Sequence, residues 1–309
     1  RMGDAAKAVA GVTERLSPAN ADRIYDQIDA KQKTDEFRPR ALFERFGIEL
    51  LATTEDPLDD LRHHRAITAS GWKGRVVTAF RPDNLTDPEH PRFREALPEL
   101  GRITSEDVTT WDGYLAALRN RRRYFIEHGG CTSTDHGHPT AHTENLPQEE
   151  AAALFGRIVR GEGDANDAER FRGQMLTEMA RMGLDDGLVM QIHPGALRRQ
   201  NPPATNVFGE AKGDDWPSRT EYVNALKPLL NAYGNERDLT IILFTLDESN
   251  YAREIAPLAG HYPALRIGPA WWFHDSPEGM RRFREQVTET GGFYNTVGFN
   301  DDTRAFLSI

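Results

Sequence analysis

The chain has 309 residues, of which 38% are hydrophobic and 28% are charged, and its formal net charge is −10. This composition is typical of a soluble globular protein with a substantial core. The acidic balance argues against a nucleic-acid partner, because phosphate binding needs a surplus of Lys and Arg. A local basic cluster is interpreted as the solvated face of a helix; its members are Arg119, Arg121, Arg122 and Arg123.

The sequence also excludes two classes of location. No apolar run approaches the roughly 20 residues of a membrane span, and the first residues do not resemble a signal peptide. The single cysteine, Cys131, rules out a disulfide within the chain. Together these features predict a cytoplasmic protein with no membrane partner.

Apolar runs that end in polar residues recur along the chain, with helical patterns between them. The runs lack strict alternation, which is typical of strands buried on both faces. Strand–helix alternation in turn predicts a parallel α/β sheet. The predicted strands are 48–52, 75–80, 124–131, 187–192, 239–246, 265–270 and 293–299. The predicted helices are 18–28, 39–46, 151–160, 168–182, 219–233 and 277–290.

The placement of polar residues favours a barrel over a doubly wound sheet. Nearly every run ends in ionisable or aromatic residues, and a barrel gathers all of its strand ends around one mouth. A doubly wound sheet uses mainly one switch point. We therefore expect a (β/α)₈ barrel of the TIM type in 48–309, after a helical segment in 1–47.

A closed barrel has eight strands, and the sequence shows seven runs of this kind. An open barrel would expose two apolar edges. We expect the first strand upstream of Arg1 and the final helix beyond Ile309, within a longer polypeptide.

Two segments after predicted strands carry the candidate catalytic residues. His193 ends the fourth run beside Pro-Gly, and it suits a metal ligand, an acid/base or a hydrogen-bond donor to substrate. Asp301 and Asp302 follow the last run; Asp301 suits a helix cap, and Asp302 suits binding of a cation or a proton. Arg304, two residues on, suits an anion.

Other strand ends carry the candidate binding residues. Asp135 closes the third run, within an Asp-His-Gly-His segment whose metal-like spacing is a weak signal. Arg81 suits a carboxylate or phosphate, with a surface ion pair to Asp83 as the alternative. Arg198 adds a third guanidinium. Of Trp271 and Trp272, one is expected in the core and one on a pocket wall, where it suits a sugar ring. These residues together predict a small anionic substrate, such as a sugar acid.

Six motifs resemble the uronate (glucuronate) isomerase family of the amidohydrolase superfamily, in the family's order, from about Leu16 to the end of the chain. They are 52–64 (ATTEDPLDDLRHH), 80–83 (FRPD), 133–136 (STDH), 191–198 (QIHPGALR), 268–275 (GPAWWFHD) and 298–308 (GFNDDTRAFLS). The resemblance implies a distorted (β/α)₈ barrel. It also implies interconversion of D-glucuronate with D-fructuronate, and of D-galacturonate with D-tagaturonate.

The resemblance assigns roles residue by residue. It implies that Asp302 binds a divalent metal, usually zinc, and takes part in proton transfer. The residues implied to line the substrate site are Arg81, Asp135, His193, Arg198, Trp272 (or Trp271) and Arg304. The family's first strand carries a His-x-His pair for the metal, which this chain lacks and which we expect upstream of Arg1.

Isomerisation moves a proton from C2 to C1 through a cis-enediol, so it needs a base near C2 and groups that stabilise the developing charge. We assign the base to Asp302, and the carboxylate and oxyanion contacts to Arg304 with Arg81 or Arg198. A metal-dependent hydrolase of the same superfamily, or an inactive truncated barrel that binds a sugar acid, is the alternative. A homo-oligomer is compatible with the sequence.

Overall fold

The computed structural model describes residues 10–209 and 215–298, and these fall into two compact units. The first unit holds residues 10–51 and 67–76 of the described chain. Its helices are α2 (Ala21–Gln32) and α3 (Pro39–Arg45), with η1 (Asp35–Phe37) between them. The ring of Trp72 packs edge-on against Phe43, with 4.9 Å between centroids, and donates a hydrogen bond to Glu44. The predicted domain boundary at residue 47 stays a prediction.

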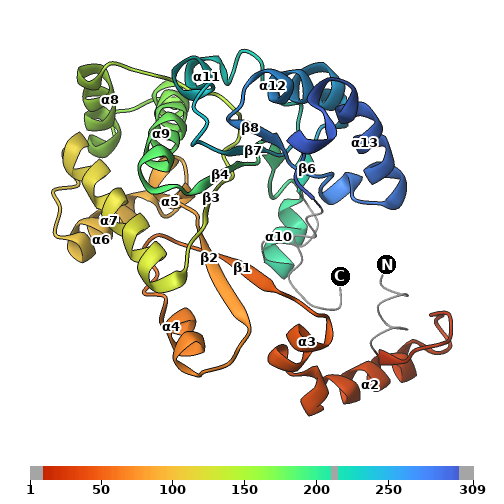
Figure 1. The fold of residues 1–309 in the computed structure, drawn as a ribbon. Helices are drawn as coiled ribbons and strands as arrows, with labels where there is room; N and C mark the ends of the chain where they lie inside the picture. Colours follow the sequence, from red (N-terminus) through yellow and green to blue (C-terminus); the bar gives the residue numbers. More distant parts are fainter. Residues whose placement is uncertain (1–9, 210–214, 299–309) are drawn as a thin grey trace. The chain divides into compact units, whose positions relative to one another are not determined.

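A parallel sheet (Figure 1) lies in the second unit except for the first two residues of β1 and of β2, and its strand order β1-β2-β3-β4-β7-β8 follows the chain. The strands are β1 (Leu50–Glu55), β2 (Arg75–Phe80), β3 (Ser133–His136), β4 (Val189–Ile192), β7 (Ile241–Leu243) and β8 (Leu265–Ile267). From β2 to β8 each strand pairs parallel with the next, so the carboxyl ends of these five strands lie at one edge. The predicted α/β class with a parallel sheet is confirmed.

Helices connect these strands, and their ends follow from local sequence. In α7 (Trp111–Gly129), the Thr110 side chain caps the first turn and Gly130 ends the helix in the left-handed conformation, at φ 60°. The other helices are α4 (Arg62–Ala69), α5 (Asp83–Thr86), α6 (Phe93–Thr104), α8 (Gln148–Arg160), α9 (Ala165–Asp186), α11 (Lys227–Tyr233), α12 (Ala256–His261) and α13 (Pro277–Gly291). Short helical turns are η2 (Glu248–Asn250), η3 (Tyr251–Ile255), η4 (Trp272–His274) and η5 (Phe293–Asn295).

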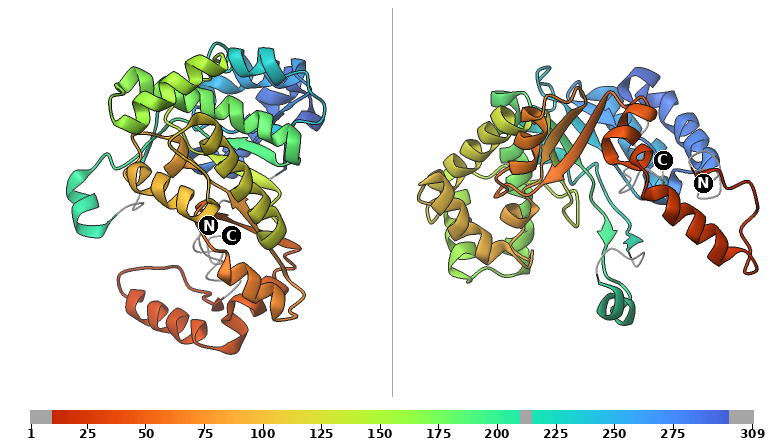
Figure 2. Two further views of the ribbon diagram at one scale, coloured as in Figure 1. Left: turned by 90° about the vertical axis from the view of Figure 1, so that its left-hand side faces the viewer. Right: turned by 90° about the horizontal axis from the view of Figure 1, so that it is seen from below.

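A hairpin leaves the sheet directly after β4. Its strands, β5 (Ala196–Leu197) and β6 (Trp216–Pro217), pair antiparallel, and α10 (Pro202–Phe208) lies between them. Both views in Figure 2 show this segment projecting from the sheet. The hairpin begins at Gly195, two residues after His193, so it starts close in sequence to a candidate site residue.

The third predicted strand is wrong. Residues 124–129 form the last turns of α7, and the strand is the polar segment Ser133–His136 instead. A short apolar run cannot be distinguished from a buried helix segment by periodicity. Ser133–His136 forms a strand because β2 and β4 pair with it on both sides.

Two further predictions need correction. Residues 293–295 form η5, and within the described chain the seventh run contributes one parallel bridge, between Ile267 and Thr296. The predicted helix at 219–233 is shorter: α11 begins at Lys227, and before it the Glu221 carboxylate accepts the backbone N–H groups of Asn224 and Ala225 in a turn.

The prediction that four neighbouring arginines of α7 are solvent-exposed is wrong for two of them. Arg121 and Arg122 are buried, at 6% and 1% exposure. Arg121 donates to the carbonyl groups of Pro57 and Asp59, and Arg122 pairs with Asp186. Both side chains therefore tie α7 to the rest of the second unit.

None of the helices in the described residues combines the length and the apolar character that a membrane crossing requires.

Candidate active site

Three predicted site residues meet at the carboxyl edge of neighbouring strands. Arg81 follows β2, Asp135 lies in β3 and His193 follows β4. The Asp135 carboxylate bridges the other two: its Oδ1 lies 2.7 Å from Nε2 of His193, and its Oδ2 lies 3.3 Å from Nη1 of Arg81. The structure thus brings together one acid, one imidazole and one guanidinium.

A second carboxylate, that of Asp83, contacts the same guanidinium. Its Oδ2 accepts a hydrogen bond from Nε of Arg81 at 2.9 Å, and its Oδ1 accepts one from the Gly137 backbone N–H at 3.1 Å. From the sequence, a surface pair between Arg81 and Asp83 is the alternative to a functional Arg81. In the structure Arg81 makes this pair and contacts Asp135 as well.

The two carboxylates stay ionised although they are largely buried. Burial raises the pKa of Asp135, but the charges of His193 and Arg81 outweigh it, and the pKa lies below its ordinary value. Burial likewise raises the pKa of Asp83, and Arg81, with the nearby histidines, brings that pKa well below the usual range. The Arg81 guanidinium is therefore held between two ionised carboxylates, which fix its orientation.

His193 is buried, and its two ring nitrogens have different surroundings. Nε2 faces Asp135, whereas Nδ1 has no hydrogen-bond partner within the described residues. The ring packs edge-on against Trp271, with 5.3 Å between centroids. A buried ring nitrogen without a partner costs free energy, so a ligand that bonds to Nδ1 would be favoured.

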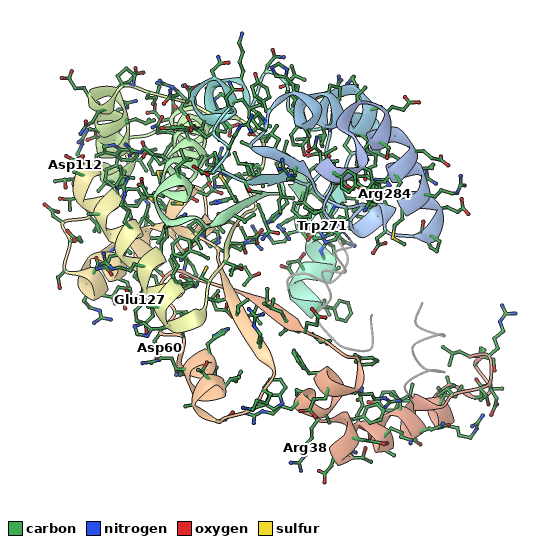
Figure 3. All side chains as sticks on the ribbon, viewed as in Figure 1. Arg38, Asp60, Asp112, Glu127, Trp271 and Arg284 are labelled. Carbon is green, nitrogen blue, oxygen red and sulfur yellow. The ribbon has the colours of Figure 1, made fainter. Side chains whose placement is uncertain are left out.

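Of the tandem tryptophans, Trp271 lies in the core and Trp272 is partly exposed, and the pocket wall stays a prediction. Trp271, labelled in Figure 3, packs with Phe244 and Leu246. Trp272 lies 4.7 Å from Trp271 between ring centroids, and its backbone is left-handed, at φ 47°. Such a conformation is unfavourable for a bulky residue and is found preferentially at functional sites.

Arg198 joins this aromatic group from the hairpin. Its guanidinium carbon lies 5.7 Å from the ring centre of Trp272, and Nη1 pairs with Asp215 at 3.1 Å. Arg198 and Trp272 therefore lie together, and Trp271 connects them to His193.

The remaining predicted residues, Asp302 and Arg304, lie outside the described residues. Within 10–209 and 215–298, no three His, Cys, Asp or Glu side chains are close enough to hold a metal ion. The described residues do not by themselves fit a divalent metal, and we derive no chemical step through one.

His136, next to Asp135, gives the site a predictable pH response. Its ring is fully buried, and burial together with the charge of His138 lowers its pKa to about 3. The unfolded chain takes up this proton near pH 6.5. Between about pH 6.5 and 3 the unfolded state therefore binds more protons, and stability falls as the pH is lowered.

We expect His136→Asn to flatten the acid side of the stability profile. The loss of one titrating group removes up to about 1.4 kcal/mol per pH unit from the slope within that window. Urea unfolding of both proteins between pH 7 and 4 measures how the free energy of unfolding depends on pH. If the free energy of unfolding fell equally steeply with decreasing pH in wild type and His136→Asn, His136 would not be the group responsible.

Sequence reasoning missed Gly137 as a site residue. A Cβ atom there would lie 2.5 Å from Nη2 of Arg81 and 2.8 Å from Cε1 of His193. The only signal was its position at a strand end, within Asp135-His136-Gly137.

Comparison with known proteins identifies the family. The family model described as glucuronate isomerase matches residues 5–309, which is nearly the whole chain. The chain belongs to the glucuronate isomerase family. Among relatives of this family, the uronate isomerase of Phenylobacterium zucineum (strain HLK1) is 64% identical over 301 residues, which cover 97% of this chain and 62% of that protein. That of Rhizobium meliloti (strain 1021) is 62% identical and covers 97% and 64%.

Solved structures of the glucuronate isomerase family agree with the fold. The crystal structure of glucuronate isomerase from Caulobacter crescentus matches with a TM-score of 0.94 at 60% identity, over 98% of this chain and 63% of that one. Uronate isomerase from Thermotoga maritima matches with a TM-score of 0.90 at 26% identity, over 99% and 67%. The chain therefore spans about three fifths of the length of the curated relatives it matches.

Proposed function

We propose that this chain supplies the substrate site of a uronate isomerase, which interconverts D-glucuronate with D-fructuronate and D-galacturonate with D-tagaturonate. The observation that carries the proposal is the cluster of Arg81, Asp135 and His193 at one edge of the sheet, in a chain of the glucuronate isomerase family. A (β/α)₈ barrel is part of the proposal, supported by parallel strands that pair in chain order.

The geometry suggests how a sugar acid would bind. Arg81 and Arg198 are guanidinium groups that suit its carboxylate. Nδ1 of the buried His193, which has no partner within the described residues, would hydrogen-bond a substrate oxygen, and the partly exposed Trp272 would give the sugar ring a flat wall. Asp135 would hold both Arg81 and His193 in place through its two oxygens.

Proton transfer rests on residues outside the described part of the chain. The family resemblance gives Asp302 the transfer of the proton between C2 and C1, and gives Arg304 an anion contact. A divalent metal with Asp302 as ligand, usually zinc in this family, belongs to the same proposal.

The uronate substrate is tested by comparing substrate classes. We expect the purified protein, supplied with a divalent metal, to convert D-glucuronate or D-galacturonate to the ketouronate, and to leave sugar lactones and amides intact. Hydrolysis of a lactone or amide without uronate isomerisation would favour the metal-dependent hydrolase instead.

The role of Trp272 is tested by Trp272→Leu. Loss of the flat aromatic surface is expected to raise KM for the uronate by about threefold to tenfold. Tyr294→Leu is the matched control, because Tyr294 is 94% exposed in the same unit. Steady-state kinetics of both variants give the two KM values for the uronate. Equal values would show that Trp272 does not contact the substrate.

A further inference from the structure

Asp83 connects the ends of two strands through its two oxygens. It begins α5, two residues after Arg81, and its side chain is 16% exposed. One oxygen accepts the Nε–H of Arg81 beyond β2, and the other accepts the Gly137 N–H beyond β3. A carboxylate used in this way fixes the plane of the guanidinium relative to both strand ends.

Gly137 lies beside the same guanidinium, close to its Nη2 atom, whereas Asp83 contacts Nε. The nearest atoms to a Cβ built at Gly137 are Nη2 of Arg81 at 2.5 Å, Cε1 of His193 at 2.8 Å and Oδ2 of Asp83 at 3.0 Å. The guanidinium thus occupies the space that any side chain at position 137 would take. Its Nη1 is then directed at Asp135, 3.3 Å away.

The charge of Asp83 is retained in this position. Burial opposes ionisation, but Arg81, His138 and His193 together outweigh burial and hold the pKa of Asp83 low. A surface ion pair contributes little, whereas a largely buried carboxylate with a charge-assisted bond to Nε keeps one orientation of the arginine. The alternative is that Asp83 only joins two loops.

We propose that Asp83 is a positioning residue, which with Gly137 holds the Arg81 guanidinium in the orientation that receives the substrate carboxylate. This inference rests on the proposed function, since it assumes that Arg81 binds a sugar acid. Asp83 itself acts through Arg81 and does not touch the substrate.

A double-mutant cycle separates positioning from simple structural support. Asp83→Asn keeps the shape and the acceptor for Gly137 but loses the charge, and is expected to lower kcat/KM for D-glucuronate about tenfold, mainly through KM. In an Arg81→Ala background the same change is expected to have no further effect. A further tenfold loss in that background would overturn the inference.

Asp167→Asn is the matched control. Asp167 makes a two-bond pair with Arg157 away from the site, and its replacement is expected to leave kcat/KM unchanged. A tenfold loss in this control would equally contradict a specific effect at Asp83.

A second readout does not depend on activity. The Nε–H of Arg81 is expected to give a slowly exchanging NMR signal that is lost in Asp83→Asn and kept in Asp167→Asn. If the wild-type protein isomerises no uronate, the proposed function fails and this signal alone decides the positioning role. An Arg81 signal unchanged in Asp83→Asn would overturn it.

Discussion

Replacing Asp186 by Asn is expected to lower the free energy of unfolding by about 3–5 kcal/mol. Asp186 ends α9, and its two oxygens accept hydrogen bonds from Nε and Nη2 of Arg122 at 2.6 and 2.8 Å. Arg122 is 1% exposed and also contacts Met179 and the ring of Phe80. The variant would leave a buried guanidinium without its counter-charge, which is far more costly than the loss of a surface pair.

The neighbouring residue provides the control for this experiment. The Asp185 side chain is 65% exposed and lies 3.9 Å from Arg119. Asp185→Asn is expected to change stability by less than about 1 kcal/mol. Urea unfolding of both variants gives the comparison, and similar losses in the two would show that the Arg122 pair does not stabilise the fold as described.

Replacing Asp135 by Asn is expected to reduce kcat/KM for D-glucuronate by about 100-fold to 1,000-fold. The carboxylate faces Nε2 of His193 and Nη1 of Arg81 at the same time. An amide has the same size but no charge, and it presents an NH2 group to one of the two nitrogen atoms that the carboxylate faces. Arg81 and His193, the two side chains proposed to contact the substrate, would therefore lose their orientation together.

Kinetics of Asp135→Asn are interpretable only if the variant is folded, so its circular dichroism and urea midpoint are measured beside those of wild type. Asp185→Asn again controls for the loss of one acid in the same unit. Activity of Asp135→Asn within twofold of wild type would exclude Asp135 from the site.

The strand ends were the part of the site that the sequence could predict. Arg81 and His193 each follow a strand that is evident from its apolar run, and parallel neighbours place them at one edge. Asp135 was found at the end of an incorrectly placed strand. The polar segment 133–136 becomes a strand through pairing with β2 and β4, which no local pattern reports.

Buried charge was the part that could not be predicted. Four arginines in five residues are typical of a solvent-exposed helix face. Arg121 and Arg122 are nevertheless buried, because carbonyl and carboxylate groups far away in the sequence accept their hydrogen bonds. Asp83 was likewise interpreted as a surface ion-pair partner of Arg81, because the sequence does not show its distant contact. Its second bond, to Gly137, joins residues 54 positions apart and is visible only in the fold.

Conversion of D-glucuronate by the purified protein is the most direct test of the proposed uronate isomerase activity. Proton NMR follows the sugar over time in the presence of a divalent metal. We expect signals of D-fructuronate to appear with wild type and Asp185→Asn, and far more slowly with Asp135→Asn. D-glucuronate and D-galacturonate that both remain unchanged with the wild-type protein would contradict it.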